Sequence, residues 1–280
     1  MNLKEAYDYS RLFLSGNKID ESDFKALCVV CSLADIKNNQ FEMHSGDFVS
    51  NKKLADMLWK LKSGEPLQYV IGRWDFYESE FYVGSGVLIP RPETEELTDA
   101  VVKAAKNILN PVVYDLCSGS GCIGISVAKA VPGAKVYCVE KSDAACEYLI
   151  KNSYLAKNAV PVKGDICRPE EIIKEAADII VSNPPYVKTA DISNLQSELA
   201  YEPKAALDGG ADGLFFYNVI ANKWKSALKS GGKLCLEIGE DQGNAVSDIL
   251  ADTGFKNIEV KKDIYQNNRI CLLYTSDAAD

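Results

Sequence analysis

From residue 112 onward, short apolar stretches alternate with helical stretches, and this alternation limits the fold more than any other feature of the chain. Candidate strands lie at residues 112–116, 135–140, 159–164, 178–183, 233–239, 257–263 and 269–274. Strands that are almost wholly apolar and are separated by helices form a mostly parallel sheet with both faces covered. Only IYQNN joins the last two strands, which favours a terminal antiparallel pair. The sequence therefore predicts an α/β fold with a seven-stranded, mostly parallel sheet.

Smaller regions flank the predicted sheet. Residues 1–65 place apolar side chains three and four positions apart in three stretches, which predicts a small helical bundle. Within residues 66–90, aromatic and polar residues alternate in WDFYESEFYV, a pattern typical of a β-hairpin. Residues 91–274 form the main domain. The tail TSDAAD (275–280) has neither apolar content nor periodicity, so we interpret it as non-native or disordered.

Composition and charge exclude several classes of function. The net charge of −9 argues against a broad electrostatic surface for nucleic acid, so no direct nucleic-acid partner is expected. No run of eighteen apolar residues and no basic-then-apolar start occur, which predicts a cytoplasmic protein without a membrane partner. His44 is the sole histidine, and Cys28 and Cys31 sit in an apolar helical run, so we expect no metal site and no hydrolase triad.

The segment VVYDLCSGSGCIGISVAKAV (112–131) reads as a strand, a glycine turn and a helix. Glycines let the backbone turn sharply and let a ligand approach it, while the start of the helix supplies N–H donors. Glu140 ends the next strand, 19 residues after Gly121, where a carboxylate can accept hydrogen bonds from both ribose hydroxyls. The pattern predicts a site for a nucleoside-containing cofactor.

Two cofactors compete for this turn. Gly119 to Gly124 fit G-x-G-x-x-G, so a dinucleotide and a nicotinamide oxidoreductase must be weighed. Asp115, four residues before Gly119, would repel a pyrophosphate but attract the ammonium group of S-adenosylmethionine, which carries no phosphate. Asp165 ends the third strand, where it could reach the adenine amino group or only cap the following helix. We favour S-adenosylmethionine.

The segment DIIVSNPPYVK (178–188) is a buried strand that ends in an amide, two prolines and an aromatic ring. The Asn183 side-chain oxygen and the Pro184 carbonyl are two acceptors for the N–H groups of a planar amide or amine. Pro184 and Pro185 fix φ near −65°, and Tyr186 can lie against the planar group. Such a clamp would orient a nitrogen for methylation without a strong general base, because the methylated nitrogen loses its extra proton to water. The alternative is a Pro-Pro loop that merely ends the strand.

Together, the residues from Asp115 to Gly121, Glu140, Asp165 and the NPPY segment resemble class I S-adenosylmethionine-dependent methyltransferases with an amino or amide target. Three further segments narrow the resemblance: PLQYVIGRWDFY (66–77), LIPRPETEEL (88–97) and YEPKAALDGGADGL (201–214). With them, the chain resembles the peptide chain release factor glutamine N5-methyltransferase family over nearly its whole length.

The resemblance implies a Rossmann-like methyltransferase domain and an N-terminal helical domain that helps to dock the substrate. The substrate would be a class-1 release factor, methylated on the glutamine of its Gly-Gly-Gln loop, with S-adenosylhomocysteine as product. Apart from the resemblance, nothing in the sequence calls for a partner surface beyond the substrate protein, so we expect a monomer. The residues implied to contact the cofactor are Cys117, Ser118, Gly119, Ser120, Gly121, Glu140, Ile166 and Asn183, while Asn183, Pro184, Pro185 and Tyr186 would hold the glutamine. Cys117 stands where a glycine is usual, and Ile166 stands where an aromatic residue can occur.

Three charged residues in these segments have two interpretations. Arg91 and Glu93 would lie on the wall of the cofactor cleft, or Glu93 would only favour the start of a helix after Pro92. Glu202 would line the substrate mouth or simply end a loop. The same clamp could also serve a ribosomal-protein glutamine, a flipped adenine of DNA or RNA, or a non-catalytic cofactor-binding scaffold. The net negative charge of the chain disfavours the nucleic-acid alternative.

Overall fold

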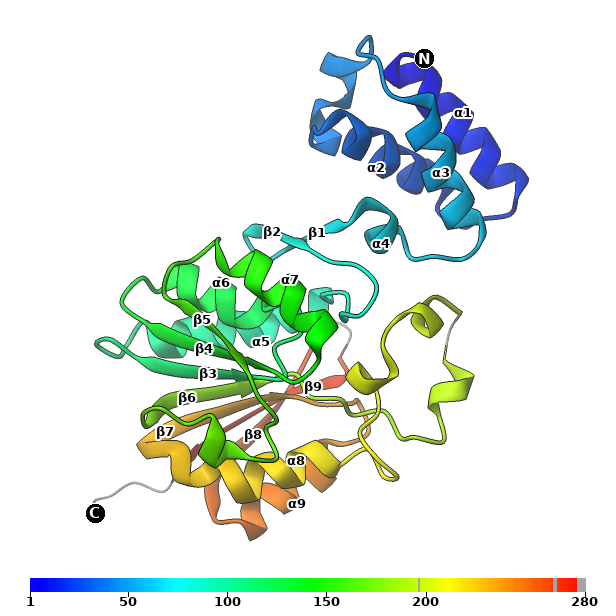
Figure 1. Cartoon of the computed structure of the whole chain (residues 1–280). Coiled ribbons are helices and arrows are strands. Elements are labelled where there is room, and N and C mark those ends of the chain that lie inside the picture. Colours follow the sequence, from blue (N-terminus) through cyan, green and yellow to red (C-terminus); the bar gives the residue numbers. More distant parts are fainter. Residues whose placement is uncertain (196, 264–265, 276–280) are drawn as a thin grey trace. The chain divides into compact units, whose positions relative to one another are not determined.

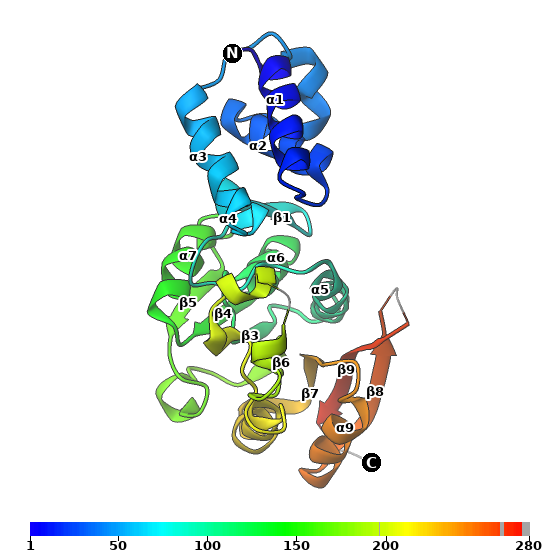
Figure 2. The same cartoon turned by 90° about the vertical axis from the view of Figure 1, so that its right-hand side faces the viewer.

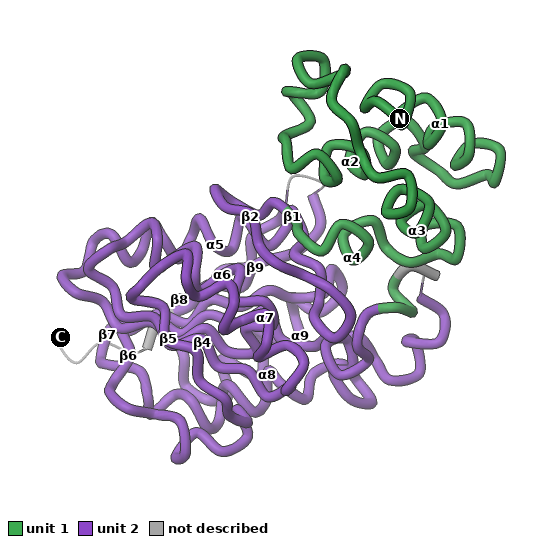
Figure 3. The backbone as a smooth tube through the Cα atoms, turned by 45° about the horizontal axis from the view of Figure 1, so that its top comes forward, with its two compact units in different colours: residues 1–74, 196–201 green, residues 75–195, 202–280 purple. Residues whose placement is uncertain are grey.

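The structure is a computed structural model that describes residues 1–195, 197–263 and 266–275. The chain divides into two compact units, residues 1–74 with 196–201 and residues 75–195 with 202–280 (Figure 3). Residues 276–280, which make up most of the tail interpreted as non-native or disordered, lie outside the described residues. Each unit is described separately below.

The first unit is helical. It contains α1 (Leu3–Gly16), α2 (Ser22–Ala34), α3 (Asn51–Lys62), α4 (Leu67–Ile71) and the 3-10 helices η1 (Asn38–His44) and η4 (Ser197–Tyr201). Asn2 and Glu5 form a reciprocal capping box that begins α1. Cys28 and Cys31 are buried in the apolar core of this unit, and burial raises the pKa of the Cys31 thiol to about 11. These two cysteines therefore serve packing.

The second unit is built on a seven-stranded sheet, as predicted (Figure 1). Its strands are β3 (Val112–Leu116), β4 (Lys135–Glu140), β5 (Ala159–Lys163), β6 (Ala177–Ser182), β7 (Leu228–Glu237), β8 (Phe255–Lys262) and β9 (Asn268–Thr275). The order is β5-β4-β3-β6-β7-β9-β8. Strands β3 to β7 pair in parallel, whereas β9 is antiparallel to both β7 and β8. The predicted terminal antiparallel pair is confirmed. A separate two-stranded sheet joins β1 (Arg73–Phe76) and β2 (Ser79–Tyr82).

Helices cover both faces of the sheet (Figures 1 and 2). On one face lie α5 (Pro92–Ala105), α6 (Cys122–Ala130) and α7 (Asp143–Ser153), and on the other lie α8 (Phe215–Val219), the π-helix η6 (Ile220–Trp224) and α9 (Gly243–Asp252). Short 3-10 helices lie at η2 (Pro169–Glu171), η3 (Ile192–Asn194), η5 (Lys204–Ala206) and η7 (Lys225–Ala227). Successive strand residues serve opposite faces: Val113 packs with α5 and α6, while Tyr114 packs with Trp224.

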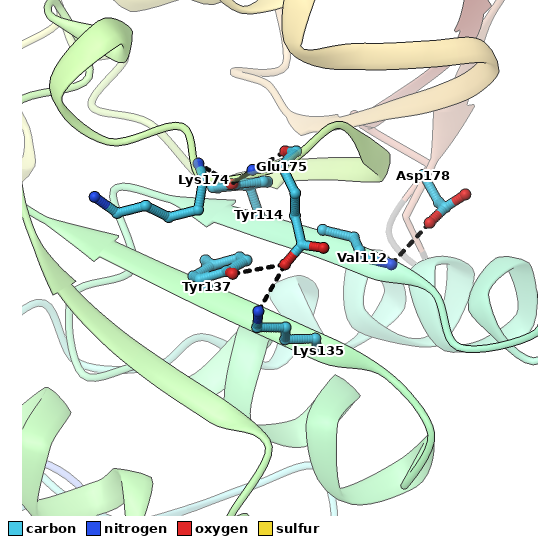
Figure 4. A network of polar contacts seen from close by, with 7 residues as sticks. All are labelled: Val112, Tyr114, Lys135, Tyr137, Lys174, Glu175 and Asp178. Carbon is cyan, nitrogen blue, oxygen red and sulfur yellow. Dashed lines mark hydrogen bonds and ion pairs between the residues drawn. The ribbon is translucent and has the colours of Figure 1, made fainter.

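A network of polar contacts lies at the amino ends of the central strands (Figure 4). It joins Val112, Tyr114, Lys135, Tyr137, Lys174, Glu175 and Asp178. The Glu175 carboxylate accepts hydrogen bonds from Lys135 Nζ and Tyr137 Oη, each at 2.7 Å. The backbone N–H of Lys174 donates to Tyr114 Oη at 2.9 Å. These contacts tie the amino edge of the sheet to the segment before β6. The carboxyl edge is the one at which open α/β sheets bind ligands.

Candidate functional site

A cavity of about 410 Å³ lies at the carboxyl ends of β3, β4, β5 and β6 in the second unit. This volume is within the range of about 300–1,000 Å³ that is usual for small-molecule sites. Ten of the predicted site residues line it: Arg91, Cys117, Ser118, Gly119, Ser120, Glu140, Asp165, Ile166, Asn183 and Pro185. Six do not: Glu93, Asp115, Gly121, Pro184, Tyr186 and Glu202. The fold thus gathers most of the predicted residues around one space.

The glycine turn forms the floor of this cavity. It is closed by hydrogen bonds from Ser118 N to Val139 O at 2.9 Å and from Gly121 N to Ser118 O at 2.8 Å. Gly121 has φ of +83°, and a Cβ atom there would stand 2.5 Å from Leu149 Cδ1, so glycine is required. Cys117 also has a left-handed φ of 59°, which costs an L-residue roughly 1–2 kcal/mol. Cys117 therefore holds a left-handed backbone conformation, which favours glycine, at a cost in stability.

Asp115 lies beneath the turn rather than on the cavity wall. Its carboxylate is fully buried, and Oδ2 accepts a hydrogen bond from the backbone N–H of Gly124 in α6 at 2.9 Å. No hydrogen-bond partner for Oδ1 is present among the described residues. Desolvation raises the pKa of Asp115 to about 7. The geometry shows Asp115 bracing the start of α6, whereas the sequence predicted that it would face an ammonium group of the cofactor.

Two carboxylates do lie on the wall. Glu140, at the end of β4, accepts hydrogen bonds from Gly119 N at 2.8 Å and from Ser142 N at 2.6 Å. These bonds fix its orientation, and a carboxylate retains further lone pairs for ligand hydroxyls. Asp165 accepts from Cys167 N at 2.9 Å and pairs with Lys141 at 2.8 Å, and Lys141 lowers the pKa of Asp165. Asp165 thus holds the turn at residues 166–167 and also lines the cavity, but it does not cap the following helix, since η2 has Arg168 as its N-cap and no side-chain cap bond.

Ser120 supplies a hydroxyl that no described residue pairs with. It lines the cavity and is 2% exposed, and none of the described residues forms a hydrogen bond with its Oγ atom. A buried hydroxyl without a partner is costly unless a ligand or water satisfies it. The orphaned hydroxyl, the tight turn and the fixed Glu140 carboxylate together fit a nucleoside that carries hydroxyl and amino groups.

Asn183 follows β6 directly and begins a polar chain that the sequence analysis did not identify. Its Nδ2 atom donates to Thr94 Oγ1 at 3.3 Å, and Thr94 Oγ1 donates to Glu237 Oε2 at 2.6 Å. Thr94 lies within the IPRPETEEL segment and lines the cavity. Glu237 ends β7, and a carboxylate at the carboxyl end of an apolar strand was the signal that could have revealed it.

Behind the NPPY segment, the glycine-rich run 207–213 forms a rigid support. Val187 N donates to Leu207 O, and Gly209 N donates to Val187 O, each at 2.8 Å. A Cβ atom on Gly209 would stand 2.7 Å from Tyr186 Cα. Only glycine permits the two segments to pack backbone to backbone here. The run therefore fixes the backbone of the NPPY segment, a role that the sequence does not reveal.

Arg91, Glu93 and Glu202 differ in position. Glu202 is buried, accepts from Ile89 N at 3.1 Å and forms an ion pair with Arg91. Arg91 lies on the cavity wall, but Glu93 and Glu202 do not. Glu202 thus braces the loop that leads into α5.

Glu237 makes the stability of the fold depend on pH. Desolvation raises the pKa of Glu237 from its ordinary value of 4.5 to about 7. The folded state therefore holds this proton more tightly, and stability is lost as the pH rises from about 4.5 through about 7. Relative to Glu237→Gln, we expect the wild-type free energy of unfolding to fall by roughly 2–4 kcal/mol over that window. Urea unfolding at pH 4.5 to 8 measures it, with exposed Glu240→Gln as the control. A constant difference between wild type and Glu237→Gln would contradict this assignment.

None of the helices in the described part of the chain has the length and apolar character needed to cross a bilayer. Among the same residues, no group of three or more His, Cys, Asp or Glu side chains is arranged to hold a metal ion.

Comparison with known proteins places the chain in a family. Residues 94–228 match the methyltransferase small domain. A release factor glutamine methyltransferase of Thermodesulfovibrio yellowstonii is 38% identical over 93% of this chain and 95% of its own length. One of Clostridium acetobutylicum is 36% identical over 85% of this chain and 84% of its own length. A solved protein-(glutamine-N5) methyltransferase of Alicyclobacillus acidocaldarius is 28% identical, with a TM-score of 0.44, over 70% of this chain and 99% of that one. On identity and coverage, the chain belongs to the release factor glutamine methyltransferase family.

Proposed function

We propose that the protein transfers a methyl group from S-adenosylmethionine to the side-chain amide nitrogen of the glutamine in the Gly-Gly-Gln loop of class-1 release factors. Membership of the family supports this activity. The observation that carries it is the position of Asn183 and Pro185 on the wall of a cavity whose floor is the glycine turn. An amide clamp and a nucleoside site thus share one space.

The cofactor site would be held by residues of the second unit. Glu140 would accept from the ribose hydroxyls, and Ser120 Oγ would gain the hydrogen-bond partner that the described residues do not supply. Asp165 and Ile166 lie together on the wall and would contact the adenine. When bound, the cofactor supplies an electrophilic methyl group on a sulfonium. The buried Asp115 would not contact the cofactor. It would hold the start of α6 in place by accepting a hydrogen bond from the N–H of Gly124.

The clamp would act on the nitrogen of the substrate amide. That nitrogen is a poor nucleophile because its lone pair is delocalised into the carbonyl. Asn183 Oδ1 and the Pro184 carbonyl would accept its two hydrogens and turn the lone pair toward the cavity. Orientation of this kind can supply about 7–11 kcal/mol when it is complete. The extra proton leaves to water.

Methyl transfer from labelled S-adenosylmethionine tests the proposal with three acceptors side by side. These are a class-1 release factor, the same factor with its loop glutamine changed to alanine, and duplex DNA. We expect label on the intact factor alone. Equal label on the glutamine-free factor would refute the proposed target, and label on DNA would assign the clamp to adenine. A ribosomal-protein mixture, added as a fourth acceptor, separates the related glutamine targets.

A further inference from the structure

Thr94 stands between a buried carboxylate and the amide of the clamp. We propose that Thr94 is a positioning residue, which uses its hydroxyl to fix the side-chain amide of Asn183 with Oδ1 available to the substrate nitrogen. This inference deepens the proposed function and rests on it. It is carried by the geometry of three side chains from α5, β7 and the end of β6.

The inner contact of this hydrogen-bond chain, between Thr94 and Glu237, is buried. Thr94 lies in the first turn of α5, Glu237 ends β7, and each is 2% exposed. Their oxygens are 2.6 Å apart, which is the usual distance for a hydroxyl that donates to a carboxylate. A hydroxyl has a single hydrogen. When Glu237 is ionised, above its pKa of about 7, that hydrogen is directed at the carboxylate, and Thr94 Oγ1 then offers only lone pairs to its other neighbour.

That neighbour is Asn183, whose Nδ2 atom donates to Thr94 Oγ1 at 3.3 Å. If the Asn183 amide were flipped, Oδ1 would face Oγ1 with no hydrogen between the two oxygens. Thr94 therefore selects one of the two orientations of the amide. In that orientation Oδ1 lies on the opposite side of the group, and no donor from the described residues reaches it.

The selected orientation is the one that a substrate amide requires. A primary amide nitrogen presents two donors, so it needs an oxygen of Asn183 and not its NH₂ group. In the flipped orientation, donors would face donors. Loss of the Thr94 hydroxyl would allow both orientations, and we expect it to lower kcat about three- to tenfold, as the net value of one hydrogen bond implies.

Kinetics of three variants test the role. Thr94→Val keeps the shape of the side chain but removes the hydroxyl, Thr94→Ser keeps the hydroxyl, and Thr98→Val is the matched control. The buried Thr98 hydroxyl lies one turn further along α5 and donates to Thr94 O at 3.1 Å, without contacting Asn183. We expect Thr94→Val to lower kcat with little change in KM for the release factor, and Thr94→Ser to recover most of the loss. If Thr94→Ser is as slow as Thr94→Val, or if Thr98→Val is equally slow, the inference fails.

A double variant shows whether Thr94 acts through Asn183. We expect Asn183→Ala with Thr94→Val to be no slower than Asn183→Ala alone, because the group being positioned is already gone. Additive losses would show that Thr94 contributes independently and would overturn the inference.

A second readout does not depend on activity. The side-chain amide signals of Asn183 in a ¹⁵N–¹H spectrum of the cofactor-free protein can be assigned by their loss in Asn183→Ala. We expect these protons to exchange slowly in wild type and Thr94→Ser, and faster in Thr94→Val. Unchanged exchange in Thr94→Val would overturn the inference. If wild type fails to methylate the release factor while exchange responds as expected, the proposed function fails and the positioning stands.

Discussion

Asn183→Ala is expected to lower the rate of methyl transfer on the order of 100-fold, while the affinity for S-adenosylmethionine stays within about tenfold of wild type. The reason is that alanine removes one of the two acceptors that orient the substrate nitrogen. Glu140, Ser120 and Asp165, which would bind the cofactor, still line the cavity in this variant. Single-turnover transfer of labelled methyl groups gives the rate, and calorimetric titration gives the cofactor affinity.

The control for this variant is Asn222→Ala. Asn222 is exposed, and among the described residues its side chain donates to Asn218 O alone, at 2.9 Å, so its loss should leave both the rate and the affinity unchanged. Near-normal transfer by Asn183→Ala would show that the Pro184 carbonyl suffices to hold the substrate. Loss of cofactor binding as large as the loss of transfer would instead assign Asn183 to the cofactor.

The fold was predictable because its strands are almost wholly apolar. β3 and β6 are buried along nearly their full length, and such strands specify an interior sheet whatever their partners are. Glu140 and Asn183 were predictable for a related reason. Glu140 ends an apolar strand and Asn183 directly follows one, and the carboxyl ends of parallel strands converge on one edge of the sheet.

The direction in which the Asp115 side chain points follows from the alternation of side chains along β3. Side chains alternate between the faces of a strand, so Asp115 shares a face with Val113, and that face is covered by α5 and α6. It therefore contacts the start of α6 instead of the cavity. Spacing from the glycine turn predicts that a carboxylate is near the site, but not which way it points.

The contact between Thr94 and Glu237 could not have been predicted from the sequence. The two residues are 143 positions apart, and their meeting depends on β7 lying next to β6. No local periodicity encodes that neighbour. The packing of Gly209 and Gly213 against the NPPY segment could not be predicted for the same reason. A glycine that is needed for close packing looks like any loop glycine until its neighbour is known.

Gly213→Ala is expected to lower the free energy of unfolding by about 2 kcal/mol or more and to reduce methyl transfer more than tenfold. Gly213 has φ of +76°, and a Cβ atom there would stand 2.5 Å from the carbonyl oxygen of Tyr186. Backbone strain of this kind costs of order 1–3 kcal/mol. The same Tyr186 oxygen accepts a hydrogen bond from Gln242 Nε2 at 3.0 Å, so the clash would also break that contact.

The matched control is Gly46→Ala, because Gly46 has ordinary φ and no atom within 4 Å of the added Cβ. Urea unfolding and labelled methyl transfer measure both effects. If Gly213→Ala behaves like Gly46→Ala, the glycine run does not hold the clamp. If stability falls but transfer by the folded fraction is normal, the run supports the fold alone. Loss of transfer beyond the loss of folded protein would show that the backbone of Tyr186, held from behind by Gly213 and Gln242, sets the geometry in which the substrate amide is presented.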